Sequence, residues 1–305
     1  MTRSIQGIHH VTAISGPAQE NVDFYTKTLN QRLVKKTVNF DDPGTYHLYY
    51  GDHTGSPGTI LTFFPFADAG PGRAGPGMAS AYSYAVARGG FDALMEKLAL
   101  DAVDFDGPVE RFGQRVITLR DPDGAPVELI ETDRDGAEAL DGFHSVTLWE
   151  ADIAPTARLL TDVFGYEELG HEVVDGTERL RLKTPGEARG TVIDVMRSDA
   201  ASIGRSGAGT IHHVAFRAAD DADQLEWREA VAGAGHSVTP VIDRQYFNAI
   251  YFREPGGVLF EIATDPPGFA VDEDVDHLGE ALKLPEKYEA HRDRIEAILP
   301  PLKVA

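Results

Sequence analysis

Histidine and carboxylate side chains are the groups in this sequence best suited to metal chemistry. The chain of 305 residues holds 11 histidines and 49 aspartates and glutamates, but no cysteine. The absence of cysteine excludes thiolate zinc sites, iron–sulfur clusters, disulfides and cysteine nucleophiles. A transition metal must therefore be bound by imidazole and carboxylate, and neutral imidazole is its commonest side-chain ligand. Which histidines act together depends on the elements that carry them.

A fourfold repeat organises the chain. Residues 8–14 form a short apolar run that ends in a turn signal at 15–17, and a helical segment and about three strand-like stretches follow. The same order returns from residue 143, and two further segments match each other at a similar offset. The apolar helical positions are Val22, Tyr25 and Leu29 in the first unit, and Ala157, Leu160 and Phe164 in the third. We therefore predict four βαβββ units, at residues 6–66, 79–133, 142–197 and 209–265.

Equivalent positions in the four units indicate which residues could bind a metal. The first-strand position holds His10, Ser83, Ser145 and His213, and the last-strand position holds Thr62, Glu128, Asp194 and Glu261. Pairing of the first and fourth units would bring together His10, His213 and Glu261. Two histidines and one carboxylate form the facial triad typical of non-haem Fe(II) oxygenases, which leaves positions open on a six-coordinate metal. The serines and carboxylates of the other two units predict a degenerate site that binds a hard cation weakly at best.

Pairing of the units also predicts the fold. A single βαβββ unit has an open face and exposed sheet edges, so it should pair with another unit to close a core. We predict an α+β protein with four units paired into two curved, barrel-like sheets. The expected segments are an N-terminal domain at 1–133, a C-terminal domain at 134–270, and an acidic, helical tail at 271–305. We expect the tail to pack as a helix, with a lid over a site as the alternative.

Charge and composition restrict the partners. The net charge is −21, and the longest basic run is two residues, so nucleic acid and anionic membranes should be repelled. No window approaches the roughly 18 to 20 apolar residues that a membrane span needs. The first residues contain no apolar signal core, so we expect a cytoplasmic location. Broad curved sheets and an acidic surface are compatible with a homo-oligomer, and we expect a dimer.

Two histidine motifs and one later segment carry a family resemblance. They are HHVT at 9–12, IHHVAF at 211–216, and DRQYF at 243–247 with the stretch 250–265 that follows it. These residues resemble the vicinal oxygen chelate superfamily and, within it, the ring-cleaving dioxygenases that open hydroquinones. The resemblance implies Fe(II), with Mn(II) as an alternative metal, on His10, His213 and Glu261, and no organic cofactor. Most catechol-cleaving members join their third and fourth units at the metal. Ser145 departs from that pattern, which favours the hydroquinone branch.

The resemblance also implies supporting residues around the metal. On a regular strand, Thr12 would face the same side as His10, whereas His212 would face away from its neighbouring ligand unless the strand is twisted or bulged. Thr12 and His9 are the candidates for substrate binding. For His9, as for His212, this requires that the strand is twisted or bulged. Arg244 would stabilise negative charge, and Tyr251 would donate to a substrate oxygen. Strand propensity for Thr12, a surface ion pair for Arg244 and core packing for Tyr251 are the structural alternatives. We expect core or solvated positions for His47, His53, His171, His236, His277 and His291.

These observations lead to one predicted function and two alternatives. We predict an Fe(II)-dependent dioxygenase that uses O₂ to open the ring of a small aromatic diol of the hydroquinone or catechol type. One alternative is a glyoxalase-type isomerase or thiol transferase, in which the metal acts as a Lewis acid without O₂. The other is a protein that binds an aromatic ligand without catalysis, but such a protein would be expected to lack the ligand triad.

Overall fold

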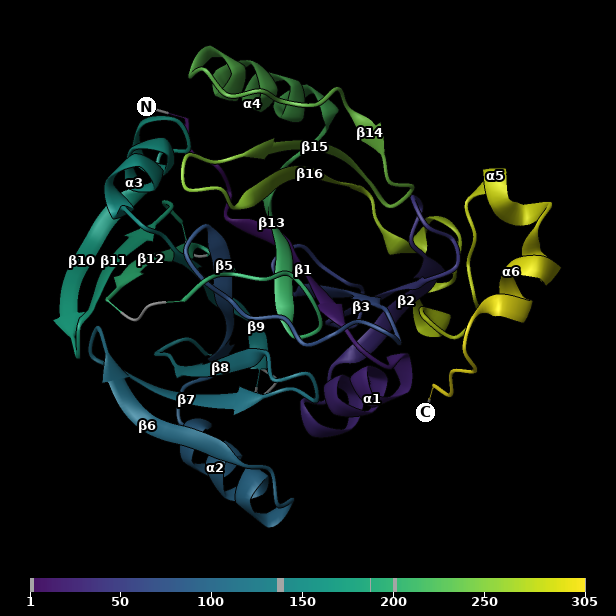
Figure 1. The fold of residues 1–305 in the computed structure, drawn as a ribbon, viewed down its shortest axis with the longest axis horizontal. Coiled ribbons are helices and arrows are strands. Elements are labelled where there is room, and N and C mark those ends of the chain that lie inside the picture. The colour runs from purple at the N-terminus through teal and green to yellow at the C-terminus, as the bar shows by residue number, and fades with distance from the viewer. Residues whose placement is uncertain (1–2, 136–139, 187, 200–201, 305) are drawn as a thin grey trace.

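Two eight-stranded sheets form the core of the protein (Figure 1). The computed structural model describes residues 3–135, 140–186, 188–199 and 202–304. The first sheet contains β1 (Ile8–Ser15), β2 (Arg32–Val38), β3 (Tyr46–Gly51), β4 (Ile60–Pro65), β13 (Thr210–Ala218), β14 (Ile242–Asp243), β15 (Phe247–Arg253) and β16 (Leu259–Pro267). The second contains β5 (Met78–Val86), β6 (Phe105–Arg111), β7 (Gln114–Arg120), β8 (Pro126–Glu131), β9 (Leu140–Trp149), β10 (Glu167–Val174), β11 (Thr177–Lys183) and β12 (Val192–Ser198).

Each unit contributes one helix, which lies on the outside of a sheet (Figure 1). These helices are α1 (Ala18–Asp23), which a π-helical turn at Phe24–Thr28 extends, α2 (Phe91–Leu100), α3 (Ile153–Asp162) and α4 (Asp221–Gly233). The predicted apolar positions on the first and third helical segments are all buried. The βαβββ order recurs four times as predicted, because the period of apolar residues alternates between that of a strand and that of a helix.

The strand order confirms which units pair. The first sheet runs β14-β15-β16-β13-β1-β4-β3-β2 and therefore joins the first and fourth units. The second runs β10-β11-β12-β9-β5-β8-β7-β6 and joins the second and third. The predicted α+β fold with two sheets of paired units is confirmed. The boundary between residues 133 and 134 falls between β8 and β9, which belong to the same sheet, and as a domain boundary it remains a prediction.

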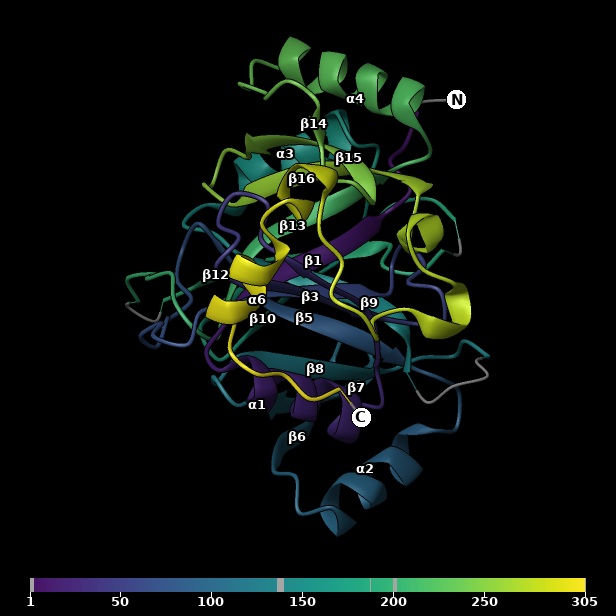
Figure 2. The ribbon, with the colours of Figure 1, turned by 90° about the vertical axis from the view of Figure 1, so that its right-hand side faces the viewer.

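The tail packs against the first sheet, on the side that faces the viewer in Figure 2. It contains 3₁₀ turns at Phe269–Val271 and Val275–His277 and the short helices α5 (Glu286–Glu289) and α6 (Arg292–Ile298). The buried Lys35 on β2 binds the tail carboxylates of Asp272, at 2.6 Å, and Glu273. Tyr288 donates to the carbonyl oxygen of Phe40. No helix that the structure describes combines the length and the apolar character needed to cross a membrane.

A pair of buried carboxyl groups lies where the two sheets meet. Glu150 directly follows β9 of the second sheet, and Glu254 directly follows β15 of the first. Glu254 accepts hydrogen bonds from Thr156 Oγ1 and from the backbone N–H of Val258. Burial first, and then the neighbouring charge of Glu254, raise the pKa of Glu150 to about 8. Glu150 is therefore protonated at neutral pH.

We predict that Glu150→Gln stabilises the protein at alkaline pH. A carboxyl whose pKa is raised in the folded state stabilises the fold below its unfolded pKa, and that contribution is lost as pH rises through the folded value. The stability advantage of Glu150→Gln over the unaltered protein should thus grow from about pH 5 and level off above about pH 8. Thermal unfolding across this range measures it. Glu229→Gln, at an exposed site on α4, is the control, and equal pH profiles for both variants would contradict the assignment.

Candidate metal centre

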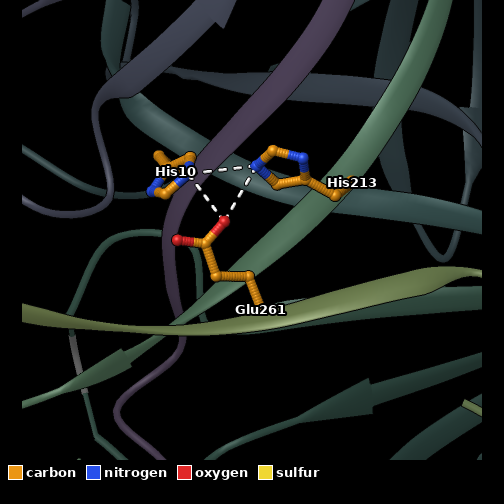
Figure 3. A group of neighbouring side chains, drawn as sticks. All are labelled: His10, His213 and Glu261. Carbon is orange, nitrogen blue, oxygen red and sulfur yellow. Dashed lines mark hydrogen bonds and ion pairs between the residues drawn. The ribbon is translucent and has the colours of Figure 1, made fainter. Parts of the chain in front are cut away.

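Strand register brings His10, His213 and Glu261 together. Ala215 on β13 has His10 on β1 as its antiparallel partner and Glu261 on β16 as its parallel partner. Residues in one such row share a face of the sheet, and His213 shares that face because it lies two residues from Ala215. The ligand atoms of the three residues lie within 4.8 Å of one another. Figure 3 shows the three side chains pointing toward a common point.

The three groups have the geometry and electrostatics of a ligand set. His213 Nε2 lies 2.9 Å from Glu261 Oε2, and His10 Nε2 lies 3.4 Å from the same oxygen. All three residues are buried, and neither Glu261 oxygen has a partner of hydrogen-bonding geometry among the described residues. Burial raises the pKa of Glu261, but the imidazoles outweigh burial and hold it below its usual range. A buried carboxylate facing two imidazole nitrogens at this spacing fits a divalent cation.

A second histidine lies beside each of the two ligand histidines. His9 Nδ1 lies 3.0 Å from His10 Nδ1, and His212 Nδ1 lies 2.7 Å from His213 Nδ1. Since a metal-bound Nε2 leaves the proton on Nδ1, each ligand can donate that proton to its neighbour and thereby fix its own ring orientation. The register of β1 against β13 shifts on both sides of His10, between Ile8 and His10 and again after Thr12. These irregularities are the kind of bulge that the sequence required for His9 and His212 to approach the site.

A cavity of about 470 Å³ adjoins the triad. Among the described residues that line it are Phe40, His47, Phe64, His212, Arg244 and Tyr251. Its volume suits one aromatic ring with substituents, and aromatic side chains form much of its wall. The structure therefore brings the three predicted catalytic residues, His212, Arg244 and Tyr251, to the cavity that the metal triad borders.

The two predicted substrate-binding residues are not part of the cavity lining that the structure describes. Thr12 is fully buried, and its Oγ1 lies 2.8 Å from Thr62 Oγ1. His9 is also buried, and neither residue is among the described residues that line the cavity. Their contacts fit a role in positioning the ligands and their neighbours, and contact with a substrate stays a prediction.

Arg244 and Tyr251 form a connected pair in the cavity wall. Arg244 Nε lies 3.1 Å from the Tyr251 hydroxyl oxygen, and an Arg244 terminal nitrogen lies 3.1 Å from a carboxylate oxygen of Asp41. Burial first, and then the charge of Glu261, raise the pKa of Tyr251 well above its usual range although Arg244 opposes them. Tyr251 is therefore a neutral hydroxyl at physiological pH. It accepts from Arg244, so its own proton remains available to an oxygen in the cavity.

His47 lines the cavity, although the sequence indicated only a core or solvated position. Its Nε2 lies 2.8 Å from Thr62 Oγ1, and its Nδ1 lies 2.8 Å from the Tyr49 hydroxyl oxygen. Burial lowers the pKa of His47 well below its usual value, and the nearby His10 lowers it further. The sequence alone could not identify it, because its position depends on strand register. Tyr49 is the strand partner of Thr62, which replaces a ligand in the first unit, and His47 lies two residues from Tyr49 on the same face.

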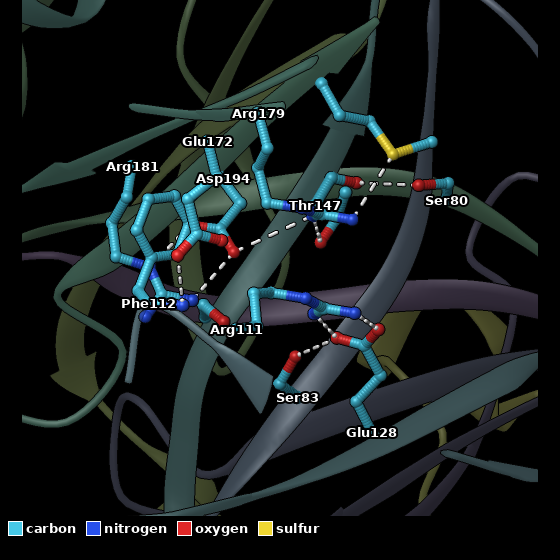
Figure 4. Close-up of polar contacts among 12 residues, drawn as sticks. Ser80, Ser83, Arg111, Phe112, Glu128, Thr147, Glu172, Arg179, Arg181 and Asp194 are labelled. Carbon is cyan, nitrogen blue, oxygen red and sulfur yellow. Dashed lines mark hydrogen bonds and ion pairs between the residues drawn. The ribbon is translucent and has the colours of Figure 1, made fainter. Parts of the chain in front are cut away.

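The second sheet corrects one expectation from the sequence. Glu128 and Asp194, at the positions equivalent to Glu261, are not free to bind a cation (Figure 4). Arg111 donates to both oxygens of Glu128 at 2.8 Å, and Arg181 donates to both oxygens of Asp194 at 2.8 Å. Such bidentate pairs give both oxygens of a carboxylate a charge-assisted hydrogen bond. These positions are degenerate as predicted, but even weak binding of a cation is excluded there, because a guanidinium group occupies its place in each unit.

Comparisons with known proteins agree with this architecture. The chain matches the family model of the glyoxalase/bleomycin resistance protein/dioxygenase superfamily over residues 7–129 and 142–262. It is 46% identical to MhqO of Bacillus subtilis, which is named as a ring-cleaving dioxygenase, over 100% of this chain and 99% of that protein. It is 36% identical to the chlorohydroquinone/hydroquinone 1,2-dioxygenase of Sphingobium indicum, over 95% of each.

Solved structures share the fold. A crystal structure named as a dioxygenase from Bacillus subtilis superposes with a TM-score of 0.92 at 46% identity, and the match covers 100% of this chain and 99% of that one. Glyoxalase I from Zea mays superposes with a TM-score of 0.64 at 18% identity, over 85% of this chain and 92% of that one. The second similarity concerns the fold alone.

We predict that removal of one ligand abolishes metal retention. His213→Ala and Glu261→Ala should each bind Fe(II) at least about 100-fold more weakly, because a ligand contributes more than a group that only orients one. Metal content after gel filtration measures this. His144→Ala is the matched control, since this histidine lies in the second sheet with its Nδ1 2.9 Å from Ser145 Oγ. Loss of metal from His144→Ala but not from the other two variants would contradict the site.

Proposed function

This chain belongs to the glyoxalase/bleomycin resistance protein/dioxygenase superfamily, and on that premise we propose that it is an Fe(II)-dependent dioxygenase that opens hydroquinone- or catechol-type rings with O₂. The family predicted from the histidine motifs is thereby confirmed. The observation that carries the proposal is the convergence of His10, His213 and Glu261 beside a cavity with aromatic walls. The relatives named as ring-cleaving and hydroquinone dioxygenases support the reaction type.

The donor set supports the choice of metal. Two imidazole nitrogens and one carboxylate oxygen suit Fe(II), and Mn(II) is the alternative that the same donors would accept. Such a metal, when bound, would lower the pKa of a coordinated substrate hydroxyl and would activate O₂. All three protein donors come from adjacent strands, β1, β13 and β16, so the side toward the cavity is left for substrate and O₂. We propose that the reaction requires no organic cofactor.

Arg244 and Tyr251 would act on the substrate oxygens. The Tyr251 hydroxyl can donate its proton to an oxygen of the diol, because Arg244 already donates to the Tyr251 oxygen. The guanidinium group is held by Asp41 at the cavity wall, where a fixed positive charge stabilises a phenolate or a developing oxyanion.

His212 would donate a hydrogen bond from the cavity wall. Although His212 is solvent-exposed, desolvation at the cavity wall and then the neighbouring His213 lower its pKa to about 4, so the ring is neutral at physiological pH. If His213 Nδ1–H donates to His212 Nδ1, the remaining proton of His212 is on Nε2. His212 then acts as a hydrogen-bond donor toward a substrate oxygen and relays the effect of that contact to the ligand His213.

Other properties stay predictions from the sequence. They are the cytoplasmic location, assembly as a dimer, and the absence of nucleic-acid and membrane partners. The choice between hydroquinone and catechol also stays open, although Ser145 favours the hydroquinone branch and His144 and Ser145 lie in the sheet that lacks the triad.

Oxygen consumption tests the proposed function. Protein reconstituted anaerobically with Fe(II) should consume O₂ when a substituted hydroquinone is added and should form a ring-opened acid that absorbs in the near ultraviolet. Glu261→Ala, treated identically, should do neither. The proposal fails if no hydroquinone or catechol supports O₂ uptake. Activity under nitrogen with a thiol substrate would instead assign the glyoxalase-type alternative.

Substitution of Tyr251 tests its assigned role. Tyr251→Phe should lower kcat by about 10- to 100-fold, because the hydrogen bond to the reacting oxygen is lost, while metal content is unchanged. Steady-state O₂ uptake measures the rate. Tyr166→Phe makes the same change in the core, at a buried hydroxyl that has no hydrogen-bond partner among the described residues. Equal rates for the two variants would show that Tyr251 serves only in packing.

A further inference from the structure

A second cavity, of about 400 Å³, lies in the second sheet and is not used by the proposed reaction. Glu128, the counterpart of Glu261, lines this cavity, so it corresponds in position to the metal cavity of the first sheet. Its remaining wall includes Arg179 on β11 and Trp149 on β9. The charged groups that line it are three arginines and the carboxylates of Asp123 and Glu128, so, unlike the triad, it offers no imidazole to a metal.

Of the three arginines packed around this cavity, two have a carboxylate to themselves and the third does not. Arg111 pairs with Glu128, and Arg181 pairs with Asp194. Arg179 has no carboxylate of its own, because the nearest carboxylate oxygen, Asp194 Oδ2, lies 3.7 Å away and already accepts from Arg181. Figure 4 shows Arg179 beside both pairs. A buried cation without its own anion is costly unless a ligand supplies the anion.

Two hydrogen-bond donors at the cavity lack adequate acceptors. Arg179 donates to Thr147 Oγ1 at 3.1 Å and to the thioether sulfur of Met196 at 3.5 Å, and a thioether is a weak acceptor. Only 13% of the Arg179 side chain is exposed. The indole nitrogen of Trp149 is buried and has no partner among the described residues. Burial and the charge of Arg111 lower the pKa of Arg179, although the charges of Asp194 and Glu128 oppose them.

The walls indicate the chemistry of the missing acceptor. Met196, Pro126 and the ring of Trp149 give the cavity apolar surface, which an inorganic anion would leave uncovered. At the rim, Arg73 and Arg120 donate to backbone carbonyls among the described residues and add positive charge around the opening, which the carboxylate of Asp123 offsets in part. We propose that this second cavity binds a small organic carboxylate with an apolar or aromatic body, and that the carboxylate pairs with Arg179.

Benzoate is a suitable probe because the cavity contains one of the two tryptophans of the chain. The other, Trp227, lies on α4 under the guanidinium group of Arg3. Titration of the full-length protein with benzoate should change the tryptophan fluorescence in a saturable way, and calorimetry should give the same Kd. Trp149→Phe should remove the fluorescence signal. Glu261→Ala should bind benzoate as the unaltered protein does, since it removes a metal ligand and not the second cavity.

Arg179→Met should raise the Kd for benzoate by about tenfold or more, because a charge-assisted hydrogen bond is lost. Arg179→Lys, which keeps the charge, should bind with intermediate affinity. Arg197→Gln is the matched control, since this arginine is exposed and pairs with Glu178. Ala81→Leu fills the cavity without changing a charge and should also weaken binding, so the test does not depend on the folding of Arg179→Met.

The proposal is overturned by any of the four results that follow. The first is the absence of saturable benzoate binding at millimolar concentration. The second is an unchanged Kd in both Arg179→Met and Ala81→Leu, with thermal unfolding showing that both are folded. The third is loss of binding in Glu261→Ala, which would place benzoate at the metal centre. Equal affinity for sulfate and benzoate would also contradict the organic nature of the ligand.

Discussion

The antiparallel pairing of β1 with β13 is the contact on which the rest of the structure depends. It joins the first unit to the fourth and brings His10 and His213, 203 residues apart in sequence, to a nitrogen–nitrogen distance of 3.3 Å. Glu261 reaches them because β16 runs parallel to β13 in matching register. Central strands of a sheet are rigid, so the ligand atoms are held in place by backbone hydrogen bonds and need little adjustment by side chains.

The two sheets share one architecture but neutralise their buried carboxylates in different ways. Each has buried carboxylates at its centre, and a buried carboxylate requires a positive partner. In the first sheet two imidazoles face Glu261 and leave room for a cation. In the second, Arg111 and Arg181 supply the positive charge directly. The carboxylates of the second sheet are therefore not available to a metal. The additional Arg179 favours an anionic ligand there.

The wall of the metal cavity depends on residues outside the repeat. The tail is fastened to β2 through the buried Lys35, and Tyr288 binds the carbonyl oxygen of Phe40, which lines the cavity. The neighbouring Asp41 holds Arg244. The segments 66–74 and 203–209, which run side by side, contribute lining residues to both cavities. The shape of each cavity is thus set by contacts between segments distant in the chain.

The sequence by itself determined the four units, the helical faces of the first and third, and the three residues that converge as candidate ligands. These follow from local periodicity and from the fact that equivalent residues of a repeat occupy equivalent places on a sheet. The tertiary structure alone decided that His47 lines the cavity, that His9 and Thr12 lie behind it, and that arginines replace a cation in the second sheet. Such positions depend on strand register, bulges and sheet curvature. Those features arise where distant segments pack, and no local pattern of residues specifies them.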